Sequence, residues 1–297
     1  MLLMREFIFG TDWWSDCDDA VAARLLVRAH ASGEIKLLGA VINATKEDSV
    51  ASLDGFLSEE GLVGLPIGID REATDYSRPG SYQARLVKYA KTYKSNEDAE
   101  DGVRLYRRLL SEASDKVELV EVGFFQVVAA LIESEPDDIS PLSGIELMKQ
   151  KVSKIWAMAG RWDRKFGHEN NFDRGPRSRA AAAVFCEKCP VPVTFLGFEI
   201  GFDVISGSKL SKDDILFGVL ADHGSAGGRS SWDPMTALMA VVGDEEKAGY
   251  TTVRGQAFAD ADTGTNIFEK CDTGPHLYVK RAFPPEYYAS EIDKRIN

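Results

Sequence analysis

Four aspartates lie within eight residues near the start of the chain: Asp12, Asp16, Asp18 and Asp19. Carboxylates this close together repel one another unless a cation or hydrogen-bond donors compensate their charge. A calcium ion, which accepts about six to eight oxygen ligands in a flexible geometry, would do so. Capping of a following helix would explain one or two of these aspartates, but not four. The spacing therefore predicts a cation site.

The segments around this cluster read as a strand and a helix. Phe7–Phe9 is a short apolar run that ends before the aspartates, and Ala20–Ala31 has helical composition. The same alternation predicts strands at 35–41, 118–122, 155–159 and 191–196, and helices at 49–61, 127–134, 179–186 and 233–242. Alternating strands and helices are typical of βαβ units and a parallel sheet. Ligands bind beyond the carboxyl ends of such strands, which is where the aspartates fall.

We therefore predict an α/β fold in which helices flank a mostly parallel central sheet of the Rossmann-like open type. Residues 1–297 are expected to form a single domain, because no linker or repeat divides them. The segments 70–105 and 205–230 are polar and irregular, and we expect them to form loops or lids.

Composition excludes several classes of protein. A formal net charge of -12 argues against binding of nucleic acid, which needs clustered Lys and Arg. Arg5 interrupts a very short apolar stretch at the N-terminus, so neither a signal peptide nor a membrane span is expected there. Four scattered cysteines are too few for a disulfide framework in 297 residues. We expect a cytoplasmic protein with reduced thiols.

The segment Thr11–Ala20, TDWWSDCDDA, resembles the longer-loop form of the N-terminal motif of the inosine-uridine nucleoside hydrolase family, TDxxSDxDDA. The resemblance continues in order through Gly39–Asn43, Val122–Val127, Met158–Gly160, Glu169–Phe172 and Ser231–Pro234. Those places correspond to the family's second strand end, its VGPLTN and MGG segments, its E(F/W)N segment, and its HDP or WDP segment. The order of the pieces is what makes the resemblance specific.

The resemblance implies calcium-dependent hydrolysis of the N-glycosidic bond of ribonucleosides to ribose and free base. It implies that Asp12 binds calcium and acts as the general base toward the attacking water. Asp19, Asp233 and the main-chain carbonyl of Gln126 would be the other protein ligands of the calcium ion. Such a site is chemically coherent, because calcium lowers the pKa of its water and carboxylates stabilise an oxocarbenium-like state.

The resemblance also implies a ribose site. Asp18 would hold the 2′- and 3′-hydroxyls, Asn171 the 3′-hydroxyl and Glu169 the 5′-hydroxyl. Asn43, at the polar end of the second strand, belongs to the expected substrate site. Asp163 does too, since it takes the place of a family asparagine six residues before the glutamate.

The side that faces the leaving base departs from the common family pattern. Trp232 replaces the histidine thought to protonate that base, as it does in the purine-preferring branch, where an indole stacks on the base. We therefore expect a purine nucleoside as substrate. Core packing is the alternative role of Trp232. Trp13, Trp14 and Trp162 are candidates for a second aromatic face.

Basic residues crowd the segment around Glu169. They are Arg161, Arg164, Lys165, Arg174, Arg177 and Arg179. They form either a solvated loop or a site for an anionic nucleoside, such as one with a phosphorylated ribose.

Two rival functions stay open. The same fold and metal could act on another ribosyl or glycosyl compound, because fold does not determine substrate. The chain could also be a nucleoside- or sugar-binding protein that has lost turnover. The resemblance further implies a homo-oligomer, either a dimer or a tetramer.

Overall fold

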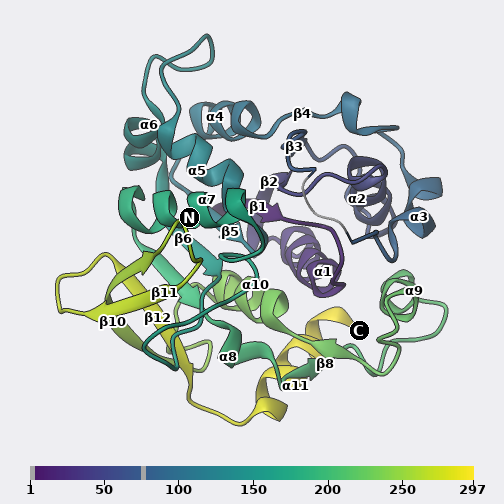
Figure 1. The fold of residues 1–297 in the computed structure, drawn as a ribbon. Coiled ribbons are helices and arrows are strands. Elements are labelled where there is room, and N and C mark those ends of the chain that lie inside the picture. The colour runs from purple at the N-terminus through teal and green to yellow at the C-terminus, as the bar shows by residue number, and fades with distance from the viewer. Residues whose placement is uncertain (1–3, 75–77) are drawn as a thin grey trace.

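Strands buried on both faces form the centre of the molecule, and the computed structural model describes residues 4–74 and 78–297 (Figure 1). Ten of the strands join one sheet in the order β11-β10-β12-β7-β6-β5-β1-β2-β3-β4. Their bounds are β1 Arg5–Thr11, β2 Ile35–Ile42, β3 Ile67–Ile69, β4 Glu100–Asp101, β5 Val117–Glu121, β6 Val152–Met158, β7 Val193–Leu196, β10 Tyr250–Ala259, β11 Asn266–Lys270 and β12 His276–Arg281. A separate antiparallel pair consists of β8 Ile205–Ser206 and β9 Arg229–Ser230.

The sheet is mostly parallel, as predicted. Every neighbouring pair from β12 to β4 runs parallel, whereas β10 pairs antiparallel with both β11 and β12. Parallel strands need helical crossovers that cover both faces of a sheet, which explains why their sequences are almost continuously apolar. The sheet takes strands from residue 5 to residue 281.

Helices cover the two faces of the sheet in two groups (Figure 1). The α-helices are α1 Asp18–Ala31, α2 Ser49–Glu59, α3 Gln83–Leu86, α4 Gly102–Glu112, α5 Gln126–Glu133, α6 Gly144–Lys151, α7 Pro176–Lys188, α8 Phe198–Gly201, α9 Ile215–Asp222, α10 Trp232–Val242 and α11 Pro285–Ile296, and the 3-10 turns are η1 Val87–Tyr89 and η2 Asn96–Asp98. Side chains alternate along β1, so that Phe7 and Phe9 pack against α1, α2 and α10. Ile8 faces the opposite core, which α4, α5, α6 and α7 cover.

All the predicted strands and helices are confirmed, with ends that differ by a few residues. The expectation of loops over 70–105 and 205–230 was wrong in part, because these segments contain short strands and helices as well as turns. Their short apolar stretches are held by the rest of the fold and carry no periodic signal of their own. Residues 75–77 of the first segment lie outside the described residues.

The described part of the chain contains neither a membrane-spanning helix nor a disulfide bond. No helix within it combines the length and the apolar character needed to cross a membrane. The cysteines at 17, 186, 189 and 271 are free thiols.

Hydrogen bonds join the carboxyl ends of β1, β2 and β5 into one rigid edge. The amide of Asn43 donates to the Thr11 carbonyl over 2.9 Å, and its side-chain Oδ1 accepts from the Phe124 amide over 2.8 Å. Gly123 lies against this junction, since a Cβ at that position would stand 2.2 Å from the Asp12 nitrogen. The close approach therefore requires glycine.

We predict that Gly123→Ala lowers the free energy of unfolding by about 1–3 kcal/mol, because the backbone of Asp12 would have to move. Gly227→Ala is the control, since a Cβ there meets nothing within 4 Å. It should change stability by no more than about 0.5 kcal/mol. Urea unfolding of both variants measures the difference, and equal stabilities would contradict this account of the junction.

Candidate functional site

The loop between β1 and α1 makes a tight reversal at the carboxyl edge of the sheet. Trp13 adopts a left-handed backbone conformation with φ of 45°, which is uncommon for a bulky residue. Its amide donates to Thr11 Oγ1 over 3.0 Å, and Gln83 Nε2 in α3 donates to its carbonyl over 2.9 Å and to that of Trp14 over 2.7 Å. Such strain persists only where surrounding contacts fix the backbone, and it is concentrated at functional sites.

A cavity of about 230 Å³ opens beside this loop. Its walls consist of Asp12, Ser15, Asp16, Asp18, Asp19, Arg78, Val122, Met158, Glu169, Asn170, Asn171, Arg174, Phe198, Trp232 and Asp233. These residues come from strand ends, helix starts and loops that are far apart in the sequence. Two larger hollows in the described part of the chain have fewer carboxylates in their walls. We therefore take this cavity as the candidate site.

Most of the residues predicted for the site line this cavity. They are Asp12, Asp18, Asp19, Glu169, Asn171, Trp232 and Asp233. Asn43 lies behind the wall, where it ties β2 to the loop after β5. Gln126 is the buried first residue of α5 and is not among the lining residues.

Asp163 lies elsewhere. Its carboxylate pairs with Arg161 over 3.0 Å and with Arg164 over 3.3 Å, and it lines a separate hollow with Trp162. The neighbouring guanidinium groups lower the pKa of Asp163, although its partial burial opposes them. The structure therefore does not bring this side chain to the wall of the candidate site.

Three buried carboxylates meet where α1 and α10 begin. Oxygen atoms of Asp18, Asp19 and Asp233 all lie within 4.8 Å of one another. Two oxygens on opposite sides of a calcium ion are about 4.6–5.2 Å apart, so one ion could contact all three carboxylates. Hard oxygen donors are what calcium and magnesium prefer, and the residues present fit such an ion. Asp12 lines the same cavity without belonging to this closest group.

Burial without compensation is unfavourable for these carboxylates. It raises the pKa of Asp12, Asp18 and Asp233 well above the usual range, and repulsion from neighbouring aspartates raises it further. Burial also raises the pKa of Asp19 to about 6, although a hydrogen bond from Thr11 Oγ1 opposes the shift. A bound cation would reverse this cost, because it stabilises the charged carboxylates.

Glu169 and Asn171 form a further part of the cavity wall, and the backbone fixes both. The carboxylate of Glu169 accepts from the amides of Gly160 over 3.0 Å and Asn171 over 2.7 Å, while burial raises its pKa to about 7. Asn171 Nδ2 donates to the carbonyls of Val122 over 2.9 Å and Met158 over 3.0 Å. These contacts use the amide hydrogens and direct Oδ1 of Asn171 as an acceptor for a ligand.

A short aromatic stack forms the third wall. Trp232 stacks on Phe198 with centroids 5.4 Å apart, and Phe198 stacks on Phe202 with centroids 6.2 Å apart. The indole of Trp232 donates to the Phe198 carbonyl over 2.8 Å, which fixes its ring. Trp232 therefore lines the cavity instead of being wholly buried in the core.

Sequence reasoning missed Phe198, because nothing in its neighbourhood matches a functional motif. Its position one residue after Gly197, which follows β7, was the available signal. The other tryptophans do not line the cavity: Trp13 and Trp14 are buried, and Trp162 borders the separate hollow.

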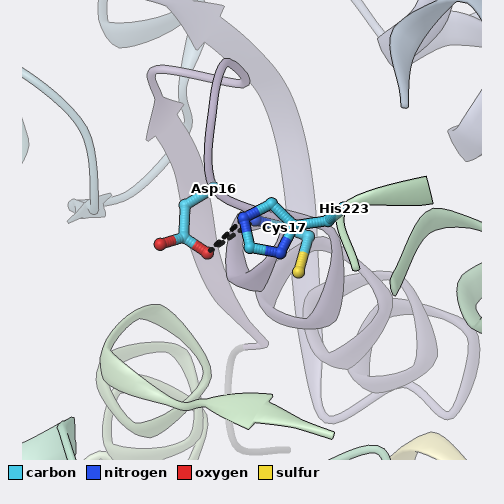
Figure 2. Close-up of side chains that lie close together, drawn as sticks. All are labelled: Asp16, Cys17 and His223. Atoms are coloured by element: carbon cyan, nitrogen blue, oxygen red, sulfur yellow. Dashed lines mark hydrogen bonds and ion pairs between the residues drawn. The ribbon is translucent and has the colours of Figure 1, made fainter. Parts of the chain in front are cut away.

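Asp16 points toward a second group of side chains at the cavity mouth. Figure 2 shows Asp16 beside His223, with Asp16 Oδ1 3.9 Å from His223 Nε2, and Cys17 close to both. Arg229 already binds the Asp16 carboxylate through two hydrogen bonds of 2.8 and 2.5 Å. Although burial acts to raise the pKa of Asp16, these bonds lower it, and burial raises the pKa of the Cys17 thiol. A neutral thiol and a paired carboxylate make this group a poor metal site.

Many solved structures share the fold of this chain, including the following three. The inosine-uridine preferring nucleoside hydrolase from Bacillus anthracis is 15% identical, with coverage of 99% of each chain and a TM-score of 0.66. The effector protein XOO4466 is 15% identical, with coverage of 100% of this chain and 94% of the other and a TM-score of 0.69. The type III effector protein XopQ, solved in complex with adenosine diphosphate ribose, is 16% identical, with coverage of 100% and 93% and a TM-score of 0.66.

The chain therefore has the nucleoside hydrolase fold, and the resemblance seen in the sequence is confirmed at that level. By sequence alone, the chain matches no protein-family model and no curated protein.

We predict that calcium stabilises the protein through the three-carboxylate group. At a calcium concentration about 100-fold above the Kd, the melting temperature should rise by about 5 °C over that with chelator. Asp233→Asn should remove at least half of the rise, whereas Asp163→Asn should keep it, because Asp163 lies outside the cavity. Scanning fluorimetry measures the rise, and an unchanged melting temperature in the native protein would contradict the prediction.

Proposed function

We propose that this protein hydrolyses the N-glycosidic bond of ribonucleosides in a calcium-dependent reaction that releases ribose and free base. One observation carries the proposal: a single cavity in a nucleoside hydrolase fold collects the acidic cluster, Glu169 and Asn171 on one side and Trp232 on the other. The cavity is smaller than the roughly 300–1,000 Å³ of a drug-sized ligand site. We therefore expect it to enclose a ribosyl group, with the base against the aromatic wall.

Asp19 and Asp233 would hold the calcium ion, and Asp18 lies within the same reach. Asp12 and the main-chain carbonyl of Gln126 are further ligands in this proposal. When bound, calcium lowers the pKa of a coordinated water and fixes the orientation of the ribose diol.

Side chains of the protein would transfer the proton and bind the ribose. Asp12 accepts the proton of the attacking water at its carboxylate, which a bound cation would keep in the charged form that a base needs. Asp18 accepts from the 2′- and 3′-hydroxyls, and Asn171 Oδ1 from the 3′-hydroxyl. Glu169, fixed by the backbone, would bind the 5′-hydroxyl. This polar wall stabilises positive charge that develops on the sugar ring.

The leaving base would stack against the aromatic wall. Phe198 and Trp232 both line the cavity, and no histidine is among its described lining residues. A stacked purine offers a larger face to an indole than a pyrimidine does, so purine nucleosides are the proposed substrates. Asn43 has a supporting role, because it positions the backbone beside Asp12.

Asp12→Asn should lower kcat for inosine hydrolysis by at least about 100-fold, because it removes the proton acceptor. Chelation of calcium should abolish the native activity, and Asp163→Asn should retain it, since that carboxylate is bound by Arg161 and Arg164. A reducing-sugar assay measures all three. Tight binding of nucleosides without sugar release would favour a protein that has lost turnover, and absence of both would favour another glycosyl substrate.

Trp232→Ala should reduce kcat/KM for inosine by about tenfold or more, because it removes the stacking surface at the aromatic wall. Trp232→Phe keeps an aromatic face and should retain most of the activity. In the native protein inosine should be cleaved faster than uridine. Base release followed by absorbance measures these rates, and faster cleavage of uridine would contradict the purine preference.

A second candidate is a ribosyl compound that carries phosphate. XopQ has the same fold and was solved with adenosine diphosphate ribose, and two arginines, Arg78 and Arg174, line the cavity here. These observations favour an anionic substrate over the other glycosyl compounds.

A further inference from the structure

Most basic residues around Glu169 already have acidic partners. Arg161 and Arg164 pair with Asp163, Arg177 pairs with Asp70 over 2.9 Å, and Arg179 pairs with Asp173 over 2.5 Å. Lys165 lies over the ring of Phe166 and lines the separate hollow. These contacts account for the basic segment as a solvated, internally paired loop, apart from one residue.

Arg174 is that residue. It lines the candidate cavity, and its Nη1 donates to Asn170 Oδ1 over 3.3 Å. Within residues 4–74 and 78–297, no ion pair joins Arg174 to a carboxylate, and the same is true of Arg78, which also lines the cavity. Two guanidinium groups therefore line one small cavity without a direct ion pair to a described carboxylate, although the charge of Arg174 acts at longer range on Asp12 and lowers the pKa of that carboxyl.

Trp14 brings these two arginines together. The guanidinium carbon of Arg174 lies 4.9 Å from the centroid of the Trp14 ring, and the indole Nε1 donates to the Arg78 carbonyl over 2.7 Å. Trp14 is itself buried among Ala44, Ala73 and Phe124. A guanidinium that stacks through its face keeps its N–H edge for two parallel hydrogen bonds to an anion. This geometry suits phosphate.

The position of the pair indicates which end of a ribose it would meet. Arg174 follows Glu169 by five residues on the same loop and contacts Asn170, and Glu169 is the group proposed for the 5′-oxygen. At the aromatic wall the corresponding cation, Arg229, is bound by Asp16. Arg174 therefore belongs to the loop that carries the group proposed for the 5′ end of the ribose, whereas the cation beside the aromatic wall is already paired.

We infer that Arg78 and Arg174 form a phosphate subsite, so that the preferred substrate is a ribosyl compound phosphorylated on its 5′-oxygen. The inference rests on the proposed function for the direction of the ribose. A protein with a formal net charge of -12 repels anions in general, so tight binding of a phosphate needs local cations of this kind. Arg78 and Arg174 act as specificity residues and take no part in bond cleavage.

The test uses the full chain with calcium and four adenosine compounds: adenosine, its 5′-monophosphate, its 3′-monophosphate and adenosine diphosphate ribose. Adenine release gives kcat/KM, and calorimetry gives Kd for any compound that is not cleaved. Compared with both adenosine and the 3′-monophosphate, the 5′-monophosphate should have a kcat/KM about tenfold or more higher, or a Kd about tenfold or more lower. The 3′-isomer has the same charge in the wrong place, so it controls for non-specific attraction.

Arg174→Gln and Arg78→Gln should each lower the preference for the 5′-monophosphate over adenosine by about tenfold. Arg164→Gln is the matched control, since it removes an arginine of the same loop that lies outside the cavity, and it should leave the preference unchanged. A stronger preference for adenosine diphosphate ribose than for the 5′-monophosphate would assign the subsite to a diphosphate and support the inference.

Equal values for adenosine and its 5′-monophosphate would overturn the inference, as would an equal loss for both compounds in Arg174→Gln. Cleavage of adenosine without any 5′-phosphate preference would leave the proposed function intact and remove only the subsite. Binding that prefers the 5′-phosphate and depends on Arg174, but releases no base, would support the subsite and contradict the proposed hydrolysis.

Discussion

Repulsion among buried carboxylates is the constraint around which this molecule is arranged. Asp18 and Asp19 occupy the first turn of α1, and Asp233 occupies the first turn of α10, with their oxygens within 4.8 Å of one another. The positive ends of two helix dipoles offset a part of that repulsion. A bound cation or protonation of the carboxyls would compensate the remainder, and α1 packs along α10 beside the group. The cavity, its polar wall and its aromatic wall all surround this point.

The rest of the site can be understood as support for that cluster. The amide of Asp233 donates to Asp18 over 3.2 Å, and the Thr11 hydroxyl donates to Asp19. These two donors offset a part of the negative charge of the cluster. Behind them, Asn43 and Gly123 hold the backbone of Asp12 at the edge of the sheet. At the mouth, Arg78 is exposed and Arg174 is half-buried, and both contact the buried Trp14.

How much could be predicted depended on how locally each feature is encoded. The aspartate loop is contiguous, so its chemistry and its place after a strand followed from periodicity and charge. Asp163 was assigned to the substrate site from its position along the chain. Its carboxylate instead pairs with Arg161 and Arg164, because the direction of its side chain is set by tertiary contacts. Phe198 and Arg78 reach the cavity only through tertiary packing. The antiparallel edge strands β10 to β12 were likewise missed, since their exposed faces dilute the apolar signal.

The hydrogen bond between the Asp233 amide and Asp18 spans 215 positions of sequence. The two halves of the acidic cluster therefore meet only when the segments around β1 and α10 have come together, which is a contact of very high order. An ion that needs both halves binds the finished fold and not a partly folded chain. An ion bound there would therefore report that these two distant segments have joined, and it would be released when they separate.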